Sequence, residues 1–304
     1  MTFRLLTYVG RDGTPRAGLL VDGTVIDVAD AAAALAPGIE TSGVVGLLAH
    51  WDAALPLLHR ISAGGAGAVG PLSGVTLKAP ILYPGQIYCA VSNYSLHLRE
   101  MNAKRKLPNK LTDKPYFFAK VARQAVIGPG ETVRLPVPDR KVDWEAEIAV
   151  VIGRPARRVS VAEAMQYVAG YTIMCDLSAR AWLFRDDWDF KVDWFGGKSF
   201  DTSAPMGPWI TPAADIADPH RLHLRLTVNG EVRQDGSSAD MIYTIPEQIS
   251  YLSEHLTLLP GDVIATGTCA GVGHPTGSHL VPGDVIEIEI EGLGRLRNPV
   301  TADA

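Results

Sequence analysis

The sequence contains few cysteines, and their spacing argues against a disulfide framework or a thiolate zinc site. Among 304 residues there are three, Cys89, Cys175 and Cys269, far apart in the chain and outside any Cys-x-x-Cys pattern. An odd number of scattered cysteines is also unusual for a small secreted, disulfide-stapled domain. We therefore expect all three thiols to be reduced.

The sequence also lacks long hydrophobic runs and clusters of basic residues. No apolar run approaches the ~20 residues that a membrane-spanning helix needs, and the first residues do not have the pattern of a secretory signal. The chain has 28 lysines and arginines against 33 acidic residues, a formal net charge of -5. This balance argues against nucleic acid and anionic membranes as partners. We expect a cytoplasmic protein that binds a small molecule.

The first part of the chain has the pattern of a small α/β domain. Three strand-like runs within residues 1–28 are separated by turn sequences, which predicts antiparallel hairpins. Residues 30–36 and 44–61 have helical apolar periodicity, and a glycine-rich stretch follows them. We place a domain boundary near residue 75, with a small N-terminal domain over 1–75 and a larger domain over 76–304.

The larger domain is predicted to be mainly β-structure with few helices. Residues 285–290 alternate isoleucine or valine with glutamate, as a strand with one buried face does. Helical patterns occur at residues 93–101, 160–170 and 245–256, and the second begins with a capping-box spacing of Ser160 and Glu163. Together these features predict an α+β fold that is mainly β.

Three carboxylates precede a buried strand in the stretch KVDWEAEIAVVIG, residues 141–153. Asp143, Glu145 and Glu147 occupy alternate positions, so an extended chain would direct them to one face. The apolar run that follows predicts a strand covered on both faces. A hard cation such as Mg²⁺ or Mn²⁺ would compensate carboxylates at the edge of a core. By itself the stretch also allows a solvated strand face or salt bridges to the basic neighbours at 140 and 141.

A candidate catalytic pair lies in the predicted helix at residues 93–101. His97 and Glu100 are three positions apart and fall on one helix face. A carboxylate beside an imidazole orients it and stabilises its protonated form, as a water-activating base requires, although a plain surface pair has the same spacing. The polar, lysine-rich residues 101–114 that follow are typical of a mobile segment that could close as a lid.

Three further positions are candidates for binding an anion or a metal. Asp176 ends an apolar strand-like run, where a helix N-cap is an alternative role. Lys198 lies among residues that favour an ordered loop, and its cation could pair with a substrate carboxylate or enolate or could be solvated. Residues 265–273, ATGTCAGVG, offer backbone N–H groups and threonine hydroxyls that could bind an anion.

Taken together, these segments resemble the fumarylacetoacetate hydrolase family over about residues 80–300. The resemblance rests on the ordered segments DWEAEIAVVIG, GYTIMCDLSAR, GGKSFDTSAPMGP, VNGEVRQ, LLPGDVIATGTCAGVG and GDVIEIEIEGLGRLRNPV. NYSLHLRE also resembles the NYxxHxxE pattern of the family's lid helix. The resemblance implies a C-terminal mixed β-sandwich roll that is usually a homodimer.

The resemblance also implies roles for individual residues. Glu145, Glu147 and Asp176 would bind Mg²⁺ or Mn²⁺, His97 and Glu100 would form the catalytic dyad, Lys198 would act in the pocket, and Arg180 and Thr268 would bind substrate. Asp143 resembles a position that is not a ligand, so we expect it to support the ligands.

The chain departs from the family pattern at two places. Many members have SARDxQ where this chain has SARAWL, residues 178–183, and TGTP where it has TGTC, residues 266–269. The first departure removes an acid and an amide that would shape a pocket, so the natural substrate is left open.

The resemblance implies enolate chemistry on a 2-oxo acid. The first expectation is a divalent-metal-dependent hydrolase that cleaves a carbon–carbon bond of an acylpyruvate-like 2,4-dioxo acid, with His97 and Glu100 activating water. Decarboxylation or keto–enol isomerisation of a 2-oxo acid is the first alternative. A non-catalytic binding protein that kept the fold and the metal is the second, because a fold alone does not fix function.

Overall fold

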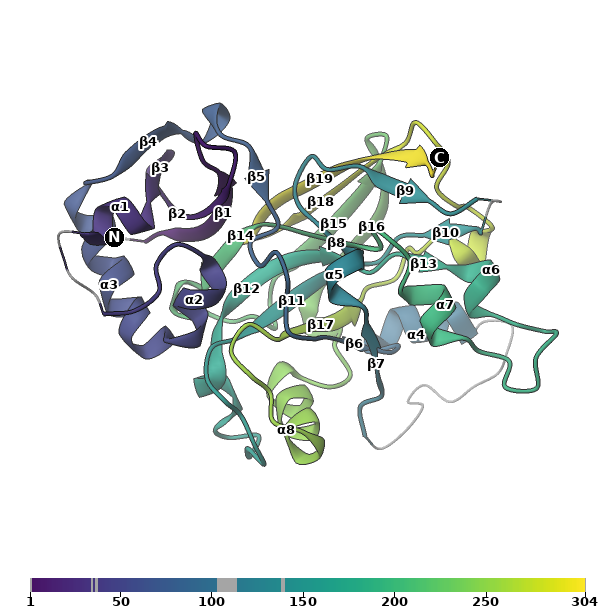
Figure 1. The fold of residues 1–304 in the computed structure, drawn as a ribbon. Helices are drawn as coiled ribbons and strands as arrows, with labels where there is room; N and C mark the ends of the chain where they lie inside the picture. Colours follow the sequence, from purple (N-terminus) through teal and green to yellow (C-terminus); the bar gives the residue numbers. More distant parts are fainter. Residues whose placement is uncertain (1, 34, 36–37, 103–113, 138–139, 304) are drawn as a thin grey trace.

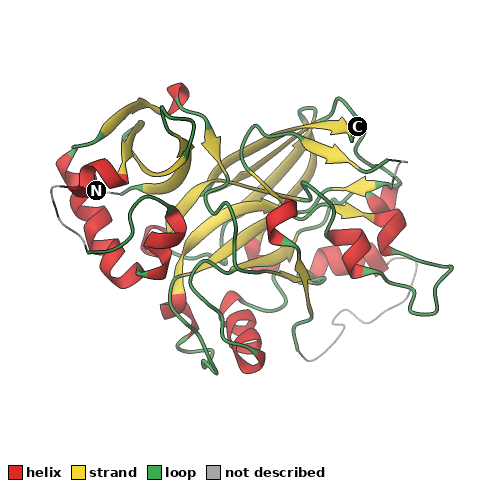
Figure 2. Cartoon of the chain, in the orientation of Figure 1, coloured by secondary structure: helices red, strands yellow, loops and turns green. Residues whose placement is uncertain are grey.

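The structure is a computed structural model with strands at its centre and helices at both ends (Figures 1 and 2). It describes residues 2–33, 35, 38–102, 114–137 and 140–303. Within these ranges, no helix is long and apolar enough to cross a membrane. The mixed fold, rich in strands, confirms the predicted fold class.

The N-terminal part forms hairpins covered by helices. Its elements are β1 Arg4–Val9, β2 Pro15–Val21, β3 Thr24–Asp27, α1 Val28–Ala33, α2 Val44–Ala49, α3 Trp51–Gly64, β4 Ala68–Pro71 and β5 Leu77–Lys78. The three predicted strands are therefore present. The predicted helix over 44–61 is instead two helices, because the backbone of His50 leaves the helical conformation and serves as both C-cap and N-cap.

One large sheet runs through the whole molecule. Its remaining strands are β6 Ile87–Ala90, β7 Phe117–Lys120, β8 Val126–Ile127, β11 Ala146–Ile152, β12 Val168–Cys175, β14 Ala204–Pro212 and β17 Val263–Thr268. The order is β4-β3-β2-β1-β14-β12-β11-β17-β6-β7, with β5 beside β1 and β8 beside β14. The N-terminal hairpins thus extend the sheet of the larger part through the β1–β14 pairing, and the boundary near residue 75 stays a prediction.

A second sheet covers one face of the first and completes a sandwich. It has the order β16-β15-β18-β19-β9 and consists of β9 Val133–Leu135, β15 His223–Val228, β16 Glu231–Ser237, β18 Val285–Ile290 and β19 Gly294–Ala302. The alternating run 285–290 directs its isoleucines inward, as predicted. Helix α8, Ile245–His255, begins with a capping box of Thr244 and Glu247, which satisfies its first backbone N–H groups.

Strand β11 explains how the two layers meet, because both of its faces are buried. Ile148, Val150 and Ile152 face the core between the sheets, while Ala149 and Val151 face the core beneath the N-terminal helices. The prediction of a strand covered on both sides is therefore confirmed. Any polar side chain that emerges from the end of this strand must be compensated at the edge of both cores.

The elements that carry the candidate site gather at the end of the molecule away from the N-terminal helices (Figure 1). They are α4 Ser95–Asn102, the two-stranded sheet of β10 Val142–Asp143 and β13 Ser178–Ala179, α6 Arg180–Leu183 and α7 Trp194–Lys198. Helix α5, Ala122–Ala125, follows β7 in the sequence.

Two local predictions were wrong. The helix expected over 160–170 is a turn followed by a 3₁₀ segment, Ala164–Tyr167, and then β12 begins at Val168, because the large sheet recruits the apolar residues. Ser160 and Glu163 do bond to each other, at 2.6 Å, but they close a turn. The loop expected around Lys198 is the short helix α7, whose first turn is capped by the Asp193 carboxylate accepting from Gly196 N.

A buried ion pair secures the N-terminal hairpins. Asp27 is buried, and its two carboxylate oxygens accept from the Arg16 guanidinium at 2.5 and 2.9 Å and from the Tyr8 hydroxyl at 2.6 Å. Burial opposes ionisation, but Arg16 and Tyr8 outweigh it and hold the pKa of Asp27 below its ordinary value. The stabilisation is therefore complete above the unfolded-state pKa of about 3.9 and is lost as the pH falls through the folded-state pKa.

We expect Arg16→Met to lower the free energy of unfolding by about 1–3 kcal/mol at pH 7, because it leaves a buried carboxylate without its cation. The difference from the unsubstituted protein should begin to shrink below about pH 3.9, where Asp27 of the unfolded chain takes up a proton, and should shrink further as the pH falls through the lowered folded-state pKa. Urea unfolding between pH 3 and pH 7 measures both effects. Arg11→Met, at an exposed position of the same hairpin, is the control, and a difference that does not change with pH would contradict the assignment.

Candidate metal centre and active site

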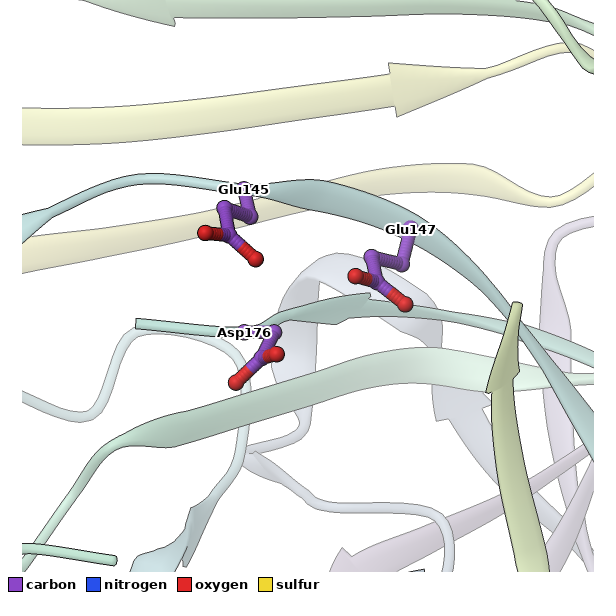
Figure 3. Close-up of side chains that lie close together, drawn as sticks. All are labelled: Glu145, Glu147 and Asp176. Atoms are coloured by element: carbon purple, nitrogen blue, oxygen red, sulfur yellow. The ribbon is translucent and has the colours of Figure 1, made fainter. Parts of the chain in front are cut away.

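Three buried carboxylates converge where the large sheet meets the two-stranded sheet (Figure 3). Glu145 precedes β11, Glu147 lies within β11, and Asp176 follows β12. Strands β11 and β12 pair with each other, and Asp176 N donates to Glu145 O at 2.9 Å just beyond the paired residues. This pairing brings the three carboxylates together. One oxygen of each lies within 4.8 Å of the others.

Three cationic side chains surround this carboxylate triad. Lys198 Nζ donates to Glu145 Oε2 at 2.8 Å and to Asp176 Oδ2 at 2.7 Å. Lys120 Nζ donates to Asp176 Oδ1 at 2.7 Å, and Arg180 Nη2 donates to Glu145 Oε1 at 2.7 Å. Both lysines are at most 2% exposed, so these ion pairs are made in a largely water-free environment.

The electrostatics leave Glu147 as the least compensated member of the triad. Its Oε2 accepts from Gly267 N at 2.8 Å. Burial raises the pKa of Glu147 well above its ordinary value, and the charges of Asp176 and Glu145 raise it further. Burial also acts to raise the pKa of Glu145, but the cations of Lys198 and Arg180 outweigh it and lower that pKa.

The donor set fits a hard divalent cation. It consists of three carboxylates held close together, the ligand type that Mg²⁺ and Mn²⁺ prefer. Among the residues that the structure describes, Glu147 has no ion-paired cation of its own, unlike Glu145 and Asp176. A divalent charge at this point would favour the ionised form of Glu147. Glu145, Glu147 and Asp176 are therefore the residues that would hold the metal, and this assignment stays a prediction. All three side chains are buried, so the alternative of a solvated strand face is wrong.

Asp143 is not part of the carboxylate triad. The strand breaks between β10 and β11, so the alternation that an ideal strand would give is interrupted at Trp144 and Glu145. The Asp143 carboxylate instead accepts from Arg180 Nε and Nη2 at 3.0 and 2.7 Å. Its expected role as a support for the ligands agrees with this geometry, because Arg180 bridges it to Glu145.

The candidate dyad lies on α4, as predicted. Asp240 fixes the start of this helix, since its carboxylate accepts from Leu96 N at 2.9 Å and from the Ser95 hydroxyl. His97 Nδ1 lies 3.4 Å from Glu100 Oε2, and both oxygens of Glu100 accept from Gly271 N at 3.1 Å. The carboxylate is thus held from two sides and sets the orientation of the imidazole.

A pocket of about 200 Å³ joins the dyad to the triad. Its polar side contains residues that the sequence analysis singled out, namely His97, Glu145, Glu147, Arg180, Lys198 and Thr268. Its other side is apolar and contains Phe118, Leu183, Phe184, Val192 and Trp194. The ring of Trp194 stacks on Phe118 with 4.9 Å between ring centres, and Lys198 Nζ lies 5.1 Å from the Phe118 ring centre. The apolar side of the pocket, which we call its wall, is therefore in contact with the charged side, which we call its floor.

Comparison with known proteins identifies the chain. Residues 86–301 match the family described as fumarylacetoacetate (FAA) hydrolase C-terminal. The chain belongs to the fumarylacetoacetate hydrolase family. It is 36% identical to a fumarylacetoacetate hydrolase domain-containing protein 2 homolog of Dictyostelium discoideum, over 98% of this chain and 97% of that protein.

Two further family members differ in activity. The mitochondrial oxaloacetate tautomerase FAHD2A of Homo sapiens is 39% identical over 76% of this chain and 71% of its own. The solved structure of maleylpyruvate hydrolase from Sphingobium sp. SYK-6, in complex with manganese(II) and pyruvate, has a TM-score of 0.77 and 30% identity over 99% of this chain and all of that one. Members of the family are thus enzymes of more than one reaction class. The cytoplasmic location of this chain stays a prediction.

The two departures from the family pattern have different structural consequences. Leu183, at the position of the family's amide, lines the pocket, whereas Ala181, at the position of the acid, is exposed. The Cys269 side chain is buried, and the buried side-chain amide of Gln234 lies against it, with Nε2 3.7 Å from Sγ. Only the change at 183 therefore alters the lining of the pocket directly.

The sequence analysis missed two buried polar residues that build the site. Lys120 ends β7 in the run FFAK, where a lysine in an apolar strand pattern was the available signal. Gln234 Oε1 accepts from Ala146 N at 2.9 Å, and its Nε2 donates to Thr268 Oγ1 at 2.8 Å. Since the Thr268 hydroxyl donates its one hydrogen to Ala146 O at 2.8 Å, it has no hydrogen left to donate to a substrate carboxylate. The lid predicted over 101–114 lies largely outside the described residues.

We expect Glu147→Gln to weaken Mn²⁺ binding by more than the roughly 10–100-fold that loss of a supporting residue costs, because it removes a ligand itself. Calorimetric titration of the metal-stripped protein measures the dissociation constant. The exposed Glu289→Gln is the matched control and should bind as the unsubstituted protein does. Unchanged affinity in Glu147→Gln would exclude this residue as a ligand.

Proposed function

We propose that this enzyme catalyses the keto–enol interconversion of a short 2-oxo acid, with a divalent cation as cofactor and oxaloacetate as the first substrate to test. The observation that carries the proposal is the buried carboxylate triad, of which Glu145 and Glu147 line the same pocket as His97. Such a site combines a place for a cation, nearby positive side chains and a base, which is what forming an enolate requires.

A divalent cation bound by the triad would act as a Lewis acid toward the oxygens of the substrate. The chain's own residues supply the rest. Lys198 and Arg180 place fixed positive charge at the floor of the pocket, where the negative charge of the enolate develops. His97 takes the proton from the carbon next to the keto group and returns it to the keto oxygen, so one C–H bond breaks, one O–H bond forms, and water is not consumed.

One observation favours this reaction over the hydrolysis that the sequence suggested first. The relatives that are 36–39% identical include proteins named oxaloacetate tautomerases, and they are more similar to this chain than the solved maleylpyruvate hydrolase is.

Hydrolysis of an acylpyruvate is the second candidate function. It is favoured by the His97–Glu100 pair, because an imidazole held by a carboxylate could activate water to attack the distal carbonyl. The carbon–carbon bond would then break and pyruvate would leave as its enolate, which takes up a proton. Decarboxylation of the same class of substrate needs no water and is a further outcome to test.

The identity of the cofactor and the oligomeric state are part of the proposal. Both Mg²⁺ and Mn²⁺ suit carboxylate ligands, and the similar maleylpyruvate hydrolase was crystallised with manganese(II). The homodimer and the absence of nucleic-acid and membrane partners stay predictions, and the dimer can be tested by light scattering.

We expect the metal-loaded protein to accelerate ketonisation of enol-oxaloacetate and to lose this activity in EDTA, because the triad would then lack its cation. The decay of the enol absorbance, followed with Mg²⁺ and then with Mn²⁺, measures the rate. Acetylpyruvate, fumarylpyruvate and keto-oxaloacetate complete the panel, with products identified by mass. Release of pyruvate plus a second acid would favour hydrolysis, and release of carbon dioxide would favour decarboxylation.

We expect His97→Ala to lower turnover by about 10²–10⁴-fold, the usual contribution of a positioned general base, while Mn²⁺ affinity stays unchanged. His223→Ala, in the exposed pair with Asp235 on the second sheet, is the control. A His97→Ala protein with full turnover would remove the imidazole from the mechanism.

A further inference from the structure

The Asp143 carboxylate has an unusual number of hydrogen-bond donors for a residue that neither binds metal nor lines the pocket. Oδ1 accepts from Trp144 N at 2.9 Å and Gly273 N at 2.6 Å. Oδ2 accepts from His274 N at 3.0 Å and from two nitrogens of Arg180 at 3.0 and 2.7 Å. Five donors on one fully buried carboxylate indicate a junction between elements that are distant in the sequence.

One side of this junction leads to the dyad. Gly273 N and His274 N belong to the loop of residues 269–274 after β17, and Gly271 N of the same loop donates to both oxygens of Glu100. Two residues of backbone therefore separate the amide held by Asp143 from the amide that holds Glu100. A small shift of the loop would therefore move Gly271 N, which donates to the Glu100 carboxylate, and Glu100 in turn orients His97.

The loop can take this path only because two of its residues are glycines. Gly271 has a φ of +104°, and a Cβ there would lie 2.1 Å from Arg233 O. A Cβ on Gly273 would lie 2.2 Å from Ser278 O. The loop therefore packs closely between β16 and the turn that follows the loop. A shift at its contact with Asp143 would move Gly271 as well, because the tightly packed backbone has little room to adjust in between.

The other side of the junction leads to the metal ligands. Arg180 donates to Asp143 and also to Glu145 Oε1 at 2.7 Å, which fixes one carboxylate of the triad. Asp143 therefore lies between the two halves of the site, and the loop gives it a direct route to the dyad that does not pass through the metal ligands.

We propose that Asp143 is a positioning residue that acts through the 269–274 loop on Glu100 and so sets the orientation of His97. Its kinetic consequence rests on the proposed function, while its structural consequence does not. The two can therefore be tested separately, by turnover and by hydrogen exchange of the loop.

The test substitution is Asp143→Asn. An asparagine keeps the size of the side chain but replaces one acceptor oxygen with an NH₂ donor, which must then face backbone N–H groups or Arg180. We expect turnover at saturating Mn²⁺ to fall by about 10–100-fold, as loss of a supporting residue does, with a clearly smaller loss of Mn²⁺ affinity, because Arg180 keeps its own bond to Glu145. An equal loss of metal affinity would mean that Asp143 acts through Arg180 on Glu145, and would overturn the proposal.

The double variant Asp143→Asn/Glu100→Gln decides whether the two residues act along one path. If Asp143 acts through Glu100, the double variant should turn over within about twofold of Glu100→Gln alone. Multiplication of the two single effects would overturn the proposal, because independent sites contribute additive free energies.

Hydrogen exchange tests the structural half without any substrate. In Asp143→Asn the amides of residues 269–274 should exchange faster than in the unsubstituted protein. Asp262→Asn is the control, because Asp262 is also buried and accepts a backbone N–H, from Leu259, but lies before the start of β17, away from the loop. Unchanged exchange in Asp143→Asn would overturn the proposal even if no substrate of the panel is turned over, whereas an inactive enzyme with faster loop exchange would contradict only the proposed function.

Discussion

The organisation of this protein depends on the compensation of buried negative charge. Glu145, Glu147 and Asp176 lie within 4.8 Å of one another at the edge of a core, where uncompensated carboxylates would be very unfavourable. Lys120, Lys198 and Arg180 compensate part of that charge, and each comes from a different element of the chain. The strand layout, the short helices and the loop after β17 all serve to bring these groups together.

The sandwich supplies the rigidity that such compensation needs. Strand β11 is covered by the second sheet on one face and by the N-terminal helices on the other, so the ligands at its start project from a backbone that cannot shift easily. The extension of the large sheet through β1 and β14 makes the N-terminal part contribute to this support. A site on packed strands holds its geometry better than one built on loops alone.

The pocket combines this charged floor with an aromatic wall. The floor suits a 2-oxo acid head, and members of the fumarylacetoacetate hydrolase family that share the architecture carry out tautomerisation or hydrolysis. Because members with this architecture differ in the reaction they catalyse, the charged floor alone does not fix the reaction class. In this chain Leu183, Phe184, Val192 and Trp194 make that wall apolar, which distinguishes it from a pocket lined by the amide common in the family pattern.

The sequence by itself indicated several local elements, because alternation and helical spacing report on neighbours along the chain, and its resemblance to the family supplied the roles expected of the site residues. It predicted the buried strand β11, the helix that carries His97 and Glu100, and the three metal-ligand candidates. Only the tertiary structure decided which groups Asp143 contacts, the loss of the predicted helix to β12 at Val168, and the recruitment of Lys120 and Gln234. These outcomes depend on contacts between segments far apart in the chain, and burial and charge pairing there override the local pattern.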